Sequence, residues 1–150
     1  PAQSNTSTNS RDAEGGKIMD RILELYNMAE PPVAETIATG THNGYDFIIL
    51  WYRYHPNAYI RIPEGHPYYG RDYTVIDDKG IVHYGFTFSG KNLHKDYGLP
   101  DGWYLGWDYG HIGDYTDYHV GCALDGRRWT VSEITAECRQ IIDEIIKEAE

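Results

Sequence analysis

The sequence predicts an α+β fold, a single domain in which an antiparallel β-sheet is packed by N- and C-terminal helices. Apolar residues recur at helical spacing in two segments, one towards each end of the chain. Between them, short runs rich in β-branched and aromatic residues alternate with Gly, Pro, Asn and Asp, which is typical of antiparallel strands. We expect residues 1–16 to be a disordered tail, because they offer almost nothing to bury, and residues 17–150 to be one α+β domain.

The first helix is predicted over residues 17–30. Ile18, Ile22 and Leu25 fall on one stripe of such a helix. The helix must end before Pro31 and Pro32, since a residue that precedes proline avoids the helical region and proline has no amide hydrogen to donate.

A β-hairpin is predicted next, with strands over residues 35–41 and 45–54. Asn43-Gly44 lies in the turn between them, and both residues tolerate the positive φ angles that a tight hairpin turn needs. The run Phe47-Ile48-Ile49-Leu50-Trp51-Tyr52 is continuously apolar or aromatic, which indicates a strand covered on both faces. A turn at residues 55–57 and a short strand over residues 58–62 are expected to follow.

Two further strands are predicted after an ordered loop over residues 63–73 that is rich in Pro, Gly and Tyr. Asp77-Asp78-Lys79-Gly80 indicates a turn, and residues 81–89 then read as a strand of β-branched and aromatic residues. The last strand is predicted over residues 103–107. Polar loops over residues 90–102 and 115–128 complete the sheet region.

The C-terminal helix has the clearest signature in the chain. Thr130 and Glu133 have the spacing of a capping box, in which each side chain satisfies a backbone amide of the other. A buried face is expected to follow, formed by Ile134, Cys138, Ile141, Ile142, Ile145 and Ala149.

Charge and cysteine content narrow the class of protein. The formal net charge of −10 argues against direct nucleic-acid binding, which needs clustered Lys and Arg, and favours basic partners or cations. No apolar run approaches the length of a membrane span and no signal-peptide pattern is present, so we expect a cytoplasmic protein with no membrane association. The two cysteines, Cys122 and Cys138, are too few for a disulfide framework; Cys138 is expected to be a buried thiol, and one bridge between the two stays open.

Four segments of the chain form a recognisable series of motifs. They are Ile62–Tyr73 (IPEGHPYYGRDY), Val82–Gly90 (VHYGFTFSG), Gly106–Asp114 (GWDYGHIGD) and, near the C-terminus, Ala136–Cys138 (AEC). In this order they resemble a family of small proteins found in bacteriophages and in related actinobacterial genomes. The pattern of that family is a PEGHP loop, then HGGxTxSG, then GFDxxHxGD, then a helix with AEC.

The chain departs from this pattern at three positions. Tyr84 stands where the family has glycine, Trp107 stands in place of phenylalanine, and Tyr109 replaces a small residue or cysteine. The resemblance implies a protein of phage or mobile-element origin, which would then act in the host cytosol. It implies no chemistry, because no activity is attached to the family.

A candidate site follows from Asp108, His111 and Asp114, which form a D-x-x-H-x-x-D run at a strand-to-turn junction. Together with His66 and His83 they make a set of imidazoles and carboxylates suited to Zn²⁺, Mn²⁺ or Fe²⁺. We therefore consider Asp108, His111 and Asp114 as ligands of a divalent metal, and His83 and His66 as catalytic residues beside it. A metal with an open position would activate water for hydrolysis.

Two alternatives to a metal site stay open. Asp108 and Asp114 can bind amides of their own turn while His111 hydrogen-bonds locally. His83 can instead serve as a base for Thr87 or Ser89, because residues at even spacing share one face of an extended strand. Aromatic residues such as Trp103, Trp107 and Tyr109 can form core and rim, or line a pocket for a flat ligand.

Two functions are consistent with these patterns. The first is a phage or mobile-element accessory protein with a His/Asp pocket that acts as a small metal-dependent hydrolase. The second is an acidic, non-enzymatic binding protein that inhibits a host defence factor or captures a small ligand. Its contacts would come from the acidic loops over residues 96–101 and 114–125.

Overall fold

The computed structural model describes residues 15–18, 20, 34–91, 99–116 and 126–150. The chain divides into two compact units, residues 1–32 and residues 33–150. In the first unit, residues 15–18 and 20 are helical, while the predicted tail up to residue 14 and most of the predicted helix over residues 17–30 lie outside the described residues. The second unit holds all the strands that the structure describes and the long C-terminal helix.

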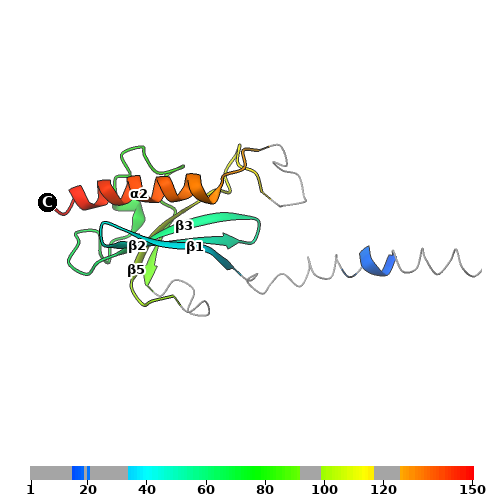
Figure 1. Ribbon diagram of the computed structural model, residues 1–150, viewed down its shortest axis with the longest axis horizontal. Coiled ribbons are helices and arrows are strands. Elements are labelled where there is room, and N and C mark those ends of the chain that lie inside the picture. The colour runs from blue at the N-terminus through cyan, green and yellow to red at the C-terminus, as the bar shows by residue number, and fades with distance from the viewer. Residues whose placement is uncertain (1–14, 19, 21–33, 92–98, 117–125) are drawn as a thin grey trace, which may run out of the picture. The chain divides into compact units, whose positions relative to one another are not determined.

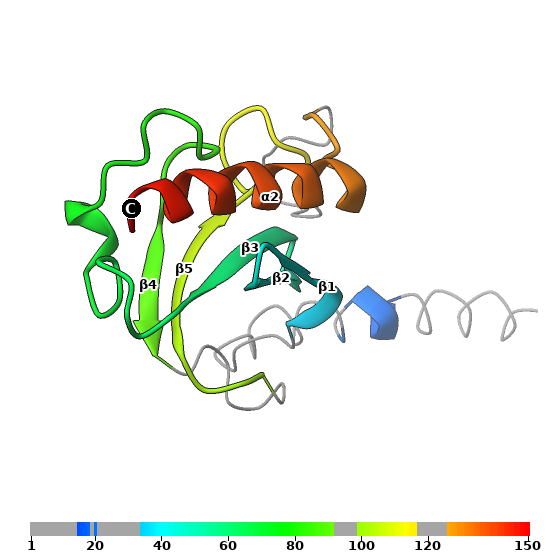
Figure 2. The same cartoon turned by 60° about the vertical axis from the view of Figure 1, so that its left-hand side comes forward.

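The second unit is an antiparallel sheet of five strands with a helix on one face (Figures 1 and 2). The strands are β1 (Glu35–His42), β2 (Tyr45–Tyr52), β3 (His55–Ile62), β4 (Phe88–Lys91) and β5 (Trp103–Asp108), in the spatial order β1-β2-β3-β5-β4. A 3-10 turn, η1 (Tyr73–Val75), lies between β3 and β4, and α2 (Val131–Lys147) follows β5. The predicted α+β class is confirmed.

Both faces of the sheet are apolar. Phe47 and Ile49 of β2 face the core that includes α2, whereas Ile48 and Leu50 join a second cluster on the opposite face with Tyr59. All four of these β2 residues are at most 4% exposed. The prediction that this strand is covered on both faces is therefore confirmed.

The first hairpin forms where Asn-Gly predicted it, with φ angles of 48° at Asn43 and 83° at Gly44. The next turn was misplaced. It falls at Arg53, whose φ is 58°, and β3 already begins at His55, so residues 55–57 belong to the strand and not to the turn. Pro56 fits in the strand although it has no amide hydrogen to donate, because only its carbonyl is needed to accept the amide of Tyr109.

The strand predicted over residues 81–89 is largely absent, since only Phe88–Lys91 is extended in a ladder. Tyr84 and Gly85 have φ angles of 56° and 82°, and the amide of Gly85 bonds the carbonyl of Val82. These left-handed residues turn the chain and remove it from the sheet. The strand predicted over residues 103–107 is confirmed as β5.

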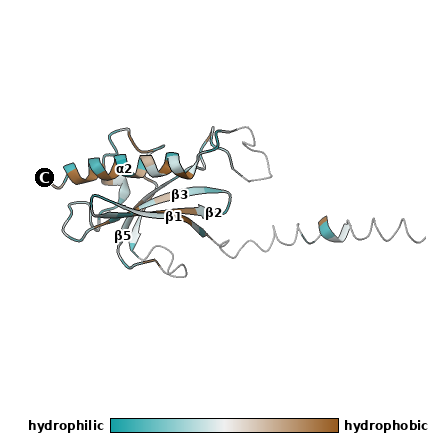
Figure 3. Ribbon diagram, in the orientation of Figure 1, coloured by the Kyte–Doolittle hydropathy of each residue, from teal (hydrophilic) through white to brown (hydrophobic). Residues whose placement is uncertain are grey.

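Helix α2 begins as predicted. The Thr130 hydroxyl accepts the amide of Glu133, whose carboxylate accepts the amide of Thr130. The predicted face is buried from Ile134 to Ile145 and lies on the side of the helix towards the sheet (Figure 3), with Cys138 as a free thiol within it. Ala149 was wrongly included, since it lies beyond the helix and is exposed. No helix among the described residues is long and apolar enough to cross a membrane.

Candidate functional site: a histidine–aspartate cluster

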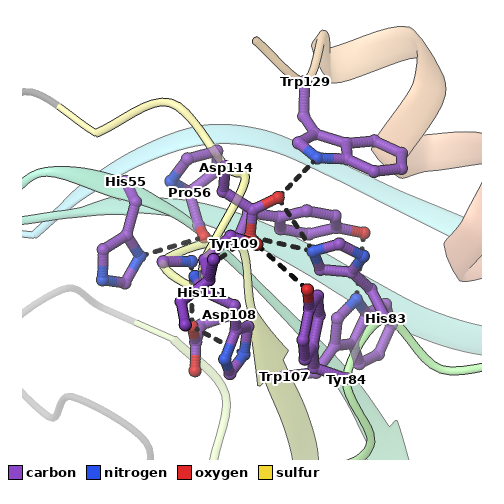
Figure 4. A network of polar contacts seen from close by, with 12 residues as sticks. His55, Pro56, His83, Tyr84, Trp107, Asp108, Tyr109, His111, Asp114 and Trp129 are labelled. Atoms are coloured by element: carbon purple, nitrogen blue, oxygen red, sulfur yellow. Dashed lines mark hydrogen bonds and ion pairs between the residues drawn. The ribbon is translucent and has the colours of Figure 1, made fainter. Parts of the chain in front are cut away.

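Side chains from three parts of the chain meet where β5 ends. The turn after Val82 supplies His83, the last residue of β5 and the segment after it supply Asp108 to Asp114, and the entry to α2 supplies Trp129 (Figure 4). A β-bridge between Asp114 and Arg127 holds the entry to α2 in place. The amide of Arg127 donates to the carbonyl of Gly113, and the carbonyl of Arg127 accepts the amide of Tyr115. We call His83, Asp114, Tyr109 and Trp129 the His83 cluster.

Asp114 is the polar centre of the cluster and is only 3% exposed. Its Oδ1 accepts the indole N–H of Trp129 at 2.9 Å and lies 3.0 Å from Nε2 of His83. Its Oδ2 accepts the amide of His111 at 3.0 Å and lies 2.9 Å from the same His83 nitrogen. A buried carboxylate needs hydrogen-bond donors, and each oxygen of Asp114 has one in addition to His83: the indole of Trp129 for Oδ1 and the amide of His111 for Oδ2.

His83 is held by aromatic rings as well as by Asp114. Its ring stacks on Tyr109, with centroids 4.8 Å apart and planes 14° apart, and it packs against Trp129 in a T-shaped arrangement with centroids 4.9 Å apart. Its Nδ1 hydrogen-bonds no other described residue. An imidazole fixed by a carboxylate at one nitrogen, with the other nitrogen available, is the arrangement that acid–base chemistry requires.

Tyr109 supports this stack from the core. Its hydroxyl accepts the indole N–H of Trp107 at 2.9 Å and donates to the carboxylate of Glu137 on α2. Burial, reinforced by the Glu137 carboxylate, raises the pKa of Tyr109 far above its ordinary value. The phenol therefore stays neutral and serves as a rigid platform under His83.

A second histidine–aspartate pair lies beside the first. Nε2 of His111 is 3.2 Å from Oδ1 of Asp108, but without hydrogen-bond geometry, so that this buried nitrogen has no hydrogen-bond partner in the described structure. Asp108 accepts the amide of Gly110 at Oδ1 and the hydroxyl of Thr87 at Oδ2. The rings of His83 and His111 have centroids 5.9 Å apart.

Tyr84 covers this pair from outside. Its ring stacks on His111 with centroids 4.5 Å apart, and its hydroxyl donates to the carbonyl of Ile112. Tyr84 has a φ of 56°, which is unfavourable for a bulky residue. Position 84 thus requires a left-handed backbone, and it is filled by a residue that gains a contact with His111.

His66 is not brought to this cluster. It is 5% exposed, its Nε2 donates to the carbonyl of Ile145 and its Nδ1 accepts the amide of Tyr68. Ile145 lies eight residues beyond Glu137 on α2, which is about 12 Å along a helix. Both ring nitrogens of His66 are committed to fastening its loop to the helix, so it has no nitrogen left for catalysis.

The three expected metal ligands do not form a ligand set. No group of three or more His, Cys, Asp or Glu side chains among the described residues is arranged to hold a metal ion. The oxygens of Asp114 are occupied by Trp129, His83 and a backbone amide, and Asp108 faces Thr87 and Gly110. By contrast, the alternative is confirmed for the two aspartates, each of which accepts an amide of its own turn. Its other part is not, since Nε2 of His111 forms no hydrogen bond with another described residue.

The idea that His83 activates Thr87 or Ser89 also lacks support. The Ser89 hydroxyl accepts the amide of Tyr73, and that of Thr87 donates to Asp108. Because residues 83–87 form no strand and the chain turns at Tyr84 and Gly85, the even spacing on which the idea depended does not apply.

Two members of the network were missed. Trp129 was passed over because nothing in its neighbourhood except the capping box marks it, and Glu137 because it does not belong to the predicted buried face of the helix. Glu137 lies in the AEC motif, which could have singled it out. A comparison with models of protein families, with curated proteins and with solved structures found no match. The site must therefore be interpreted from its own geometry.

Proposed function

We propose that this protein is a small hydrolase that uses His83 and His111 for acid–base catalysis without a metal. The observation that carries the proposal is the pairing of His83 with the buried Asp114. Asp114 fixes the ring orientation and stabilises the imidazolium that forms when His83 takes a proton. In this role His83 accepts a proton from water at Nδ1 while the water oxygen attacks the substrate.

The second pair supplies a general acid. His111, with Asp108 beside it, would donate a proton to the departing oxygen of an ester or phosphoester. The ring separation of 5.9 Å allows one small polar group to contact both imidazoles. Strained backbone often accompanies functional sites, and the left-handed Tyr84 beside His83 fits that pattern.

The chain offers a matched control for the test. His42 and Asp143 form another pair, with Nε2 and Oδ1 2.9 Å apart, but the side chains are 25% and 49% exposed, against 14% and 4% for His83 and Asp114. Hydrolysis of bis-p-nitrophenyl phosphate, p-nitrophenyl phosphate and p-nitrophenyl butyrate should be measured in EDTA.

We expect turnover of one of these substrates to fall at least 100-fold in His83→Gln and to stay within twofold in His42→Gln. Circular dichroism of both variants establishes that they are folded. Equal losses in the two variants, or turnover that EDTA abolishes, would overturn the proposal. So would the absence of turnover in the unmodified protein.

The phage or mobile-element origin belongs to this proposal and is supported by the four motifs alone. The second candidate is an acidic binding protein that inhibits a host factor, which the net charge of −10 favours. Asp114 is buried and cannot contribute to such a surface, whereas Asp101 is exposed. Capture of a host protein that Asp101→Lys abolishes and His83→Gln leaves intact would favour this second function.

A further inference from the structure

A cavity of about 600 Å³ lies at the end of the sheet opposite to the His83 cluster. Its lining comes from Asp46 at the start of β2, Arg61 at the end of β3, Lys91 at the end of β4 and Asp101 just before β5. Figure 2 shows the end of β4 and the start of β5 side by side, as their register requires. The volume is in the range of small-molecule sites, roughly 300–1,000 Å³.

The loop after β3 completes the cavity with Glu64 and Tyr69. This loop is the PEGHP segment, and His66 fastens it to α2 from the buried side. The amide of His66 also bonds the carbonyl of Pro63, and its carbonyl accepts the amide of Tyr69. His66 therefore fixes the part of the loop that faces the cavity. The PEGHP segment, which has no role in the His83 cluster, thus has a role in this cavity.

Arg61 is held in place within the cavity wall. Its guanidinium donates to the carbonyl of Asp101 and lies 3.9 Å from the carboxylate of Asp46. Its side chain also lies against Gly102, where any Cβ would come within 2.5 Å of Nε. Arg61 thus already has partners in the Asp101 carbonyl and the Asp46 carboxylate before any ligand arrives.

The remaining charges have no such partners. Lys91, Glu64 and Asp101 are exposed, and none of their charged groups forms an ion pair with another described residue. One ammonium and two carboxylates around a cavity are complementary to a ligand that carries one negative and one positive group. The ring of Tyr69 adds an apolar surface between them.

We propose that this cavity binds a small zwitterion, a free amino acid or a short peptide. Lys91 pairs with its carboxylate, while Glu64 and Asp101 pair with its ammonium group. This site is independent of the proposed hydrolase. Residues 57 and 62 of β3, which pair with Asp108 and Trp103, are five residues apart, which is roughly 16 Å along a strand.

Isothermal titration of the full chain with trialanine tests the proposal, with alanine as the probe for a free amino acid. N-acetyl-trialanine lacks the ammonium group and trialanine amide lacks the carboxylate. We expect saturable binding of trialanine or alanine with one site per chain. Each blocked peptide should bind at least tenfold more weakly than trialanine, because it leaves one charged partner in the cavity unpaired.

Lys91→Met should weaken binding of the zwitterion at least tenfold, and Glu64→Gln several-fold. Lys147→Met is the matched control, since Lys147 pairs with Glu144 on the outer face of α2, and it should leave binding unchanged. Three outcomes would each overturn the proposal. The first is the absence of saturable binding of trialanine and alanine up to about 10 mM. The others are that the blocked peptides bind as tightly as trialanine, or that Lys91→Met and Lys147→Met have equal effects. Hydrolase activity is measured separately and should not change in Lys91→Met.

Discussion

His83 Nε2 lies 2.9 and 3.0 Å from the two carboxylate oxygens of Asp114, although the two residues are 31 positions apart in the chain. The contact joins the turn after Val82 to the segment after β5, and Trp129 brings the entry of α2 to the same carboxylate. One buried aspartate thereby holds three segments together and positions an imidazole. Stability and proposed activity should therefore both depend on it.

Asp114→Asn should lower the free energy of unfolding by about 2–3 kcal/mol, because an amide cannot accept every donor that now faces the carboxylate. The measurement is urea denaturation at pH 7. Asp143→Asn, in the exposed His42 pair, should cost less than about 1 kcal/mol. Similar losses in the two variants would show that burial of Asp114 does not matter.

His66→Ala should destabilise the fold by about 3 kcal/mol, since it empties a buried space and leaves the Ile145 carbonyl and the Tyr68 amide without their partner. His42→Ala, at an exposed position, should cost less than about 1 kcal/mol. Urea denaturation measures both. Because His66 is an anchor here and not a catalytic residue, turnover per folded molecule should stay at the level of the unmodified protein. A loss of turnover larger than the loss of folded protein would show that His66 takes part in catalysis.

Tyr84→Gly and Tyr84→Ala separate backbone strain from side-chain contacts. Both variants lose the stack on His111 and the bond to the Ile112 carbonyl, but only glycine adopts a φ of 56° without strain. Tyr84→Gly should therefore be more stable than Tyr84→Ala by about 1 kcal/mol in urea denaturation. Equal stabilities would mean that the turn at residue 84 changes its conformation in the variants.

Alkaline pH should destabilise the fold in a defined window. Burial raises the pKa of the Cys138 thiol from 9.0 to about 12. The unfolded chain releases this proton above its ordinary pKa and the folded chain keeps it, so the free energy of unfolding falls as pH rises from about 9 to about 12. Burial also raises the pKa of Tyr59, from 10.0 to about 12, which adds to the same slope.

The test compares urea denaturation at pH 8, 9 and 10 for the unmodified protein and for Cys138→Ala. The variant should have a shallower decline, whatever its stability at pH 8, because it has lost one of the groups that contribute to the slope. Native protein should also resist thiol labelling at position 138 at pH 8. The labelling is measured in Cys122→Ala, in which Cys138 is the one remaining thiol. Rapid labelling of Cys138 would contradict its burial.

The sequence by itself determined those features that depend on local rules. Asn43-Gly44 specified the first hairpin because few residues accept its positive φ angles, and Thr130 with Glu133 specified the start of α2 because their hydrogen bonds span three residues. The apolar run from Phe47 predicted a strand buried on both sides. For Asp108 and Asp114 the sequence left two readings open, metal ligation and binding of their own turn amides, and the second, a local interaction, is the one that the structure shows.

Only the tertiary structure decided which imidazole met which carboxylate. His83 and His66 looked alike in the sequence, but one faces a buried aspartate and the other a helix carbonyl. The left-handed turns at Arg53 and Tyr84 were likewise not predictable, since neither residue type favours them and tertiary contacts hold Tyr84 in place. These features depend on distances between residues far apart in the chain, and such distances are set by the packing of α2 on the sheet.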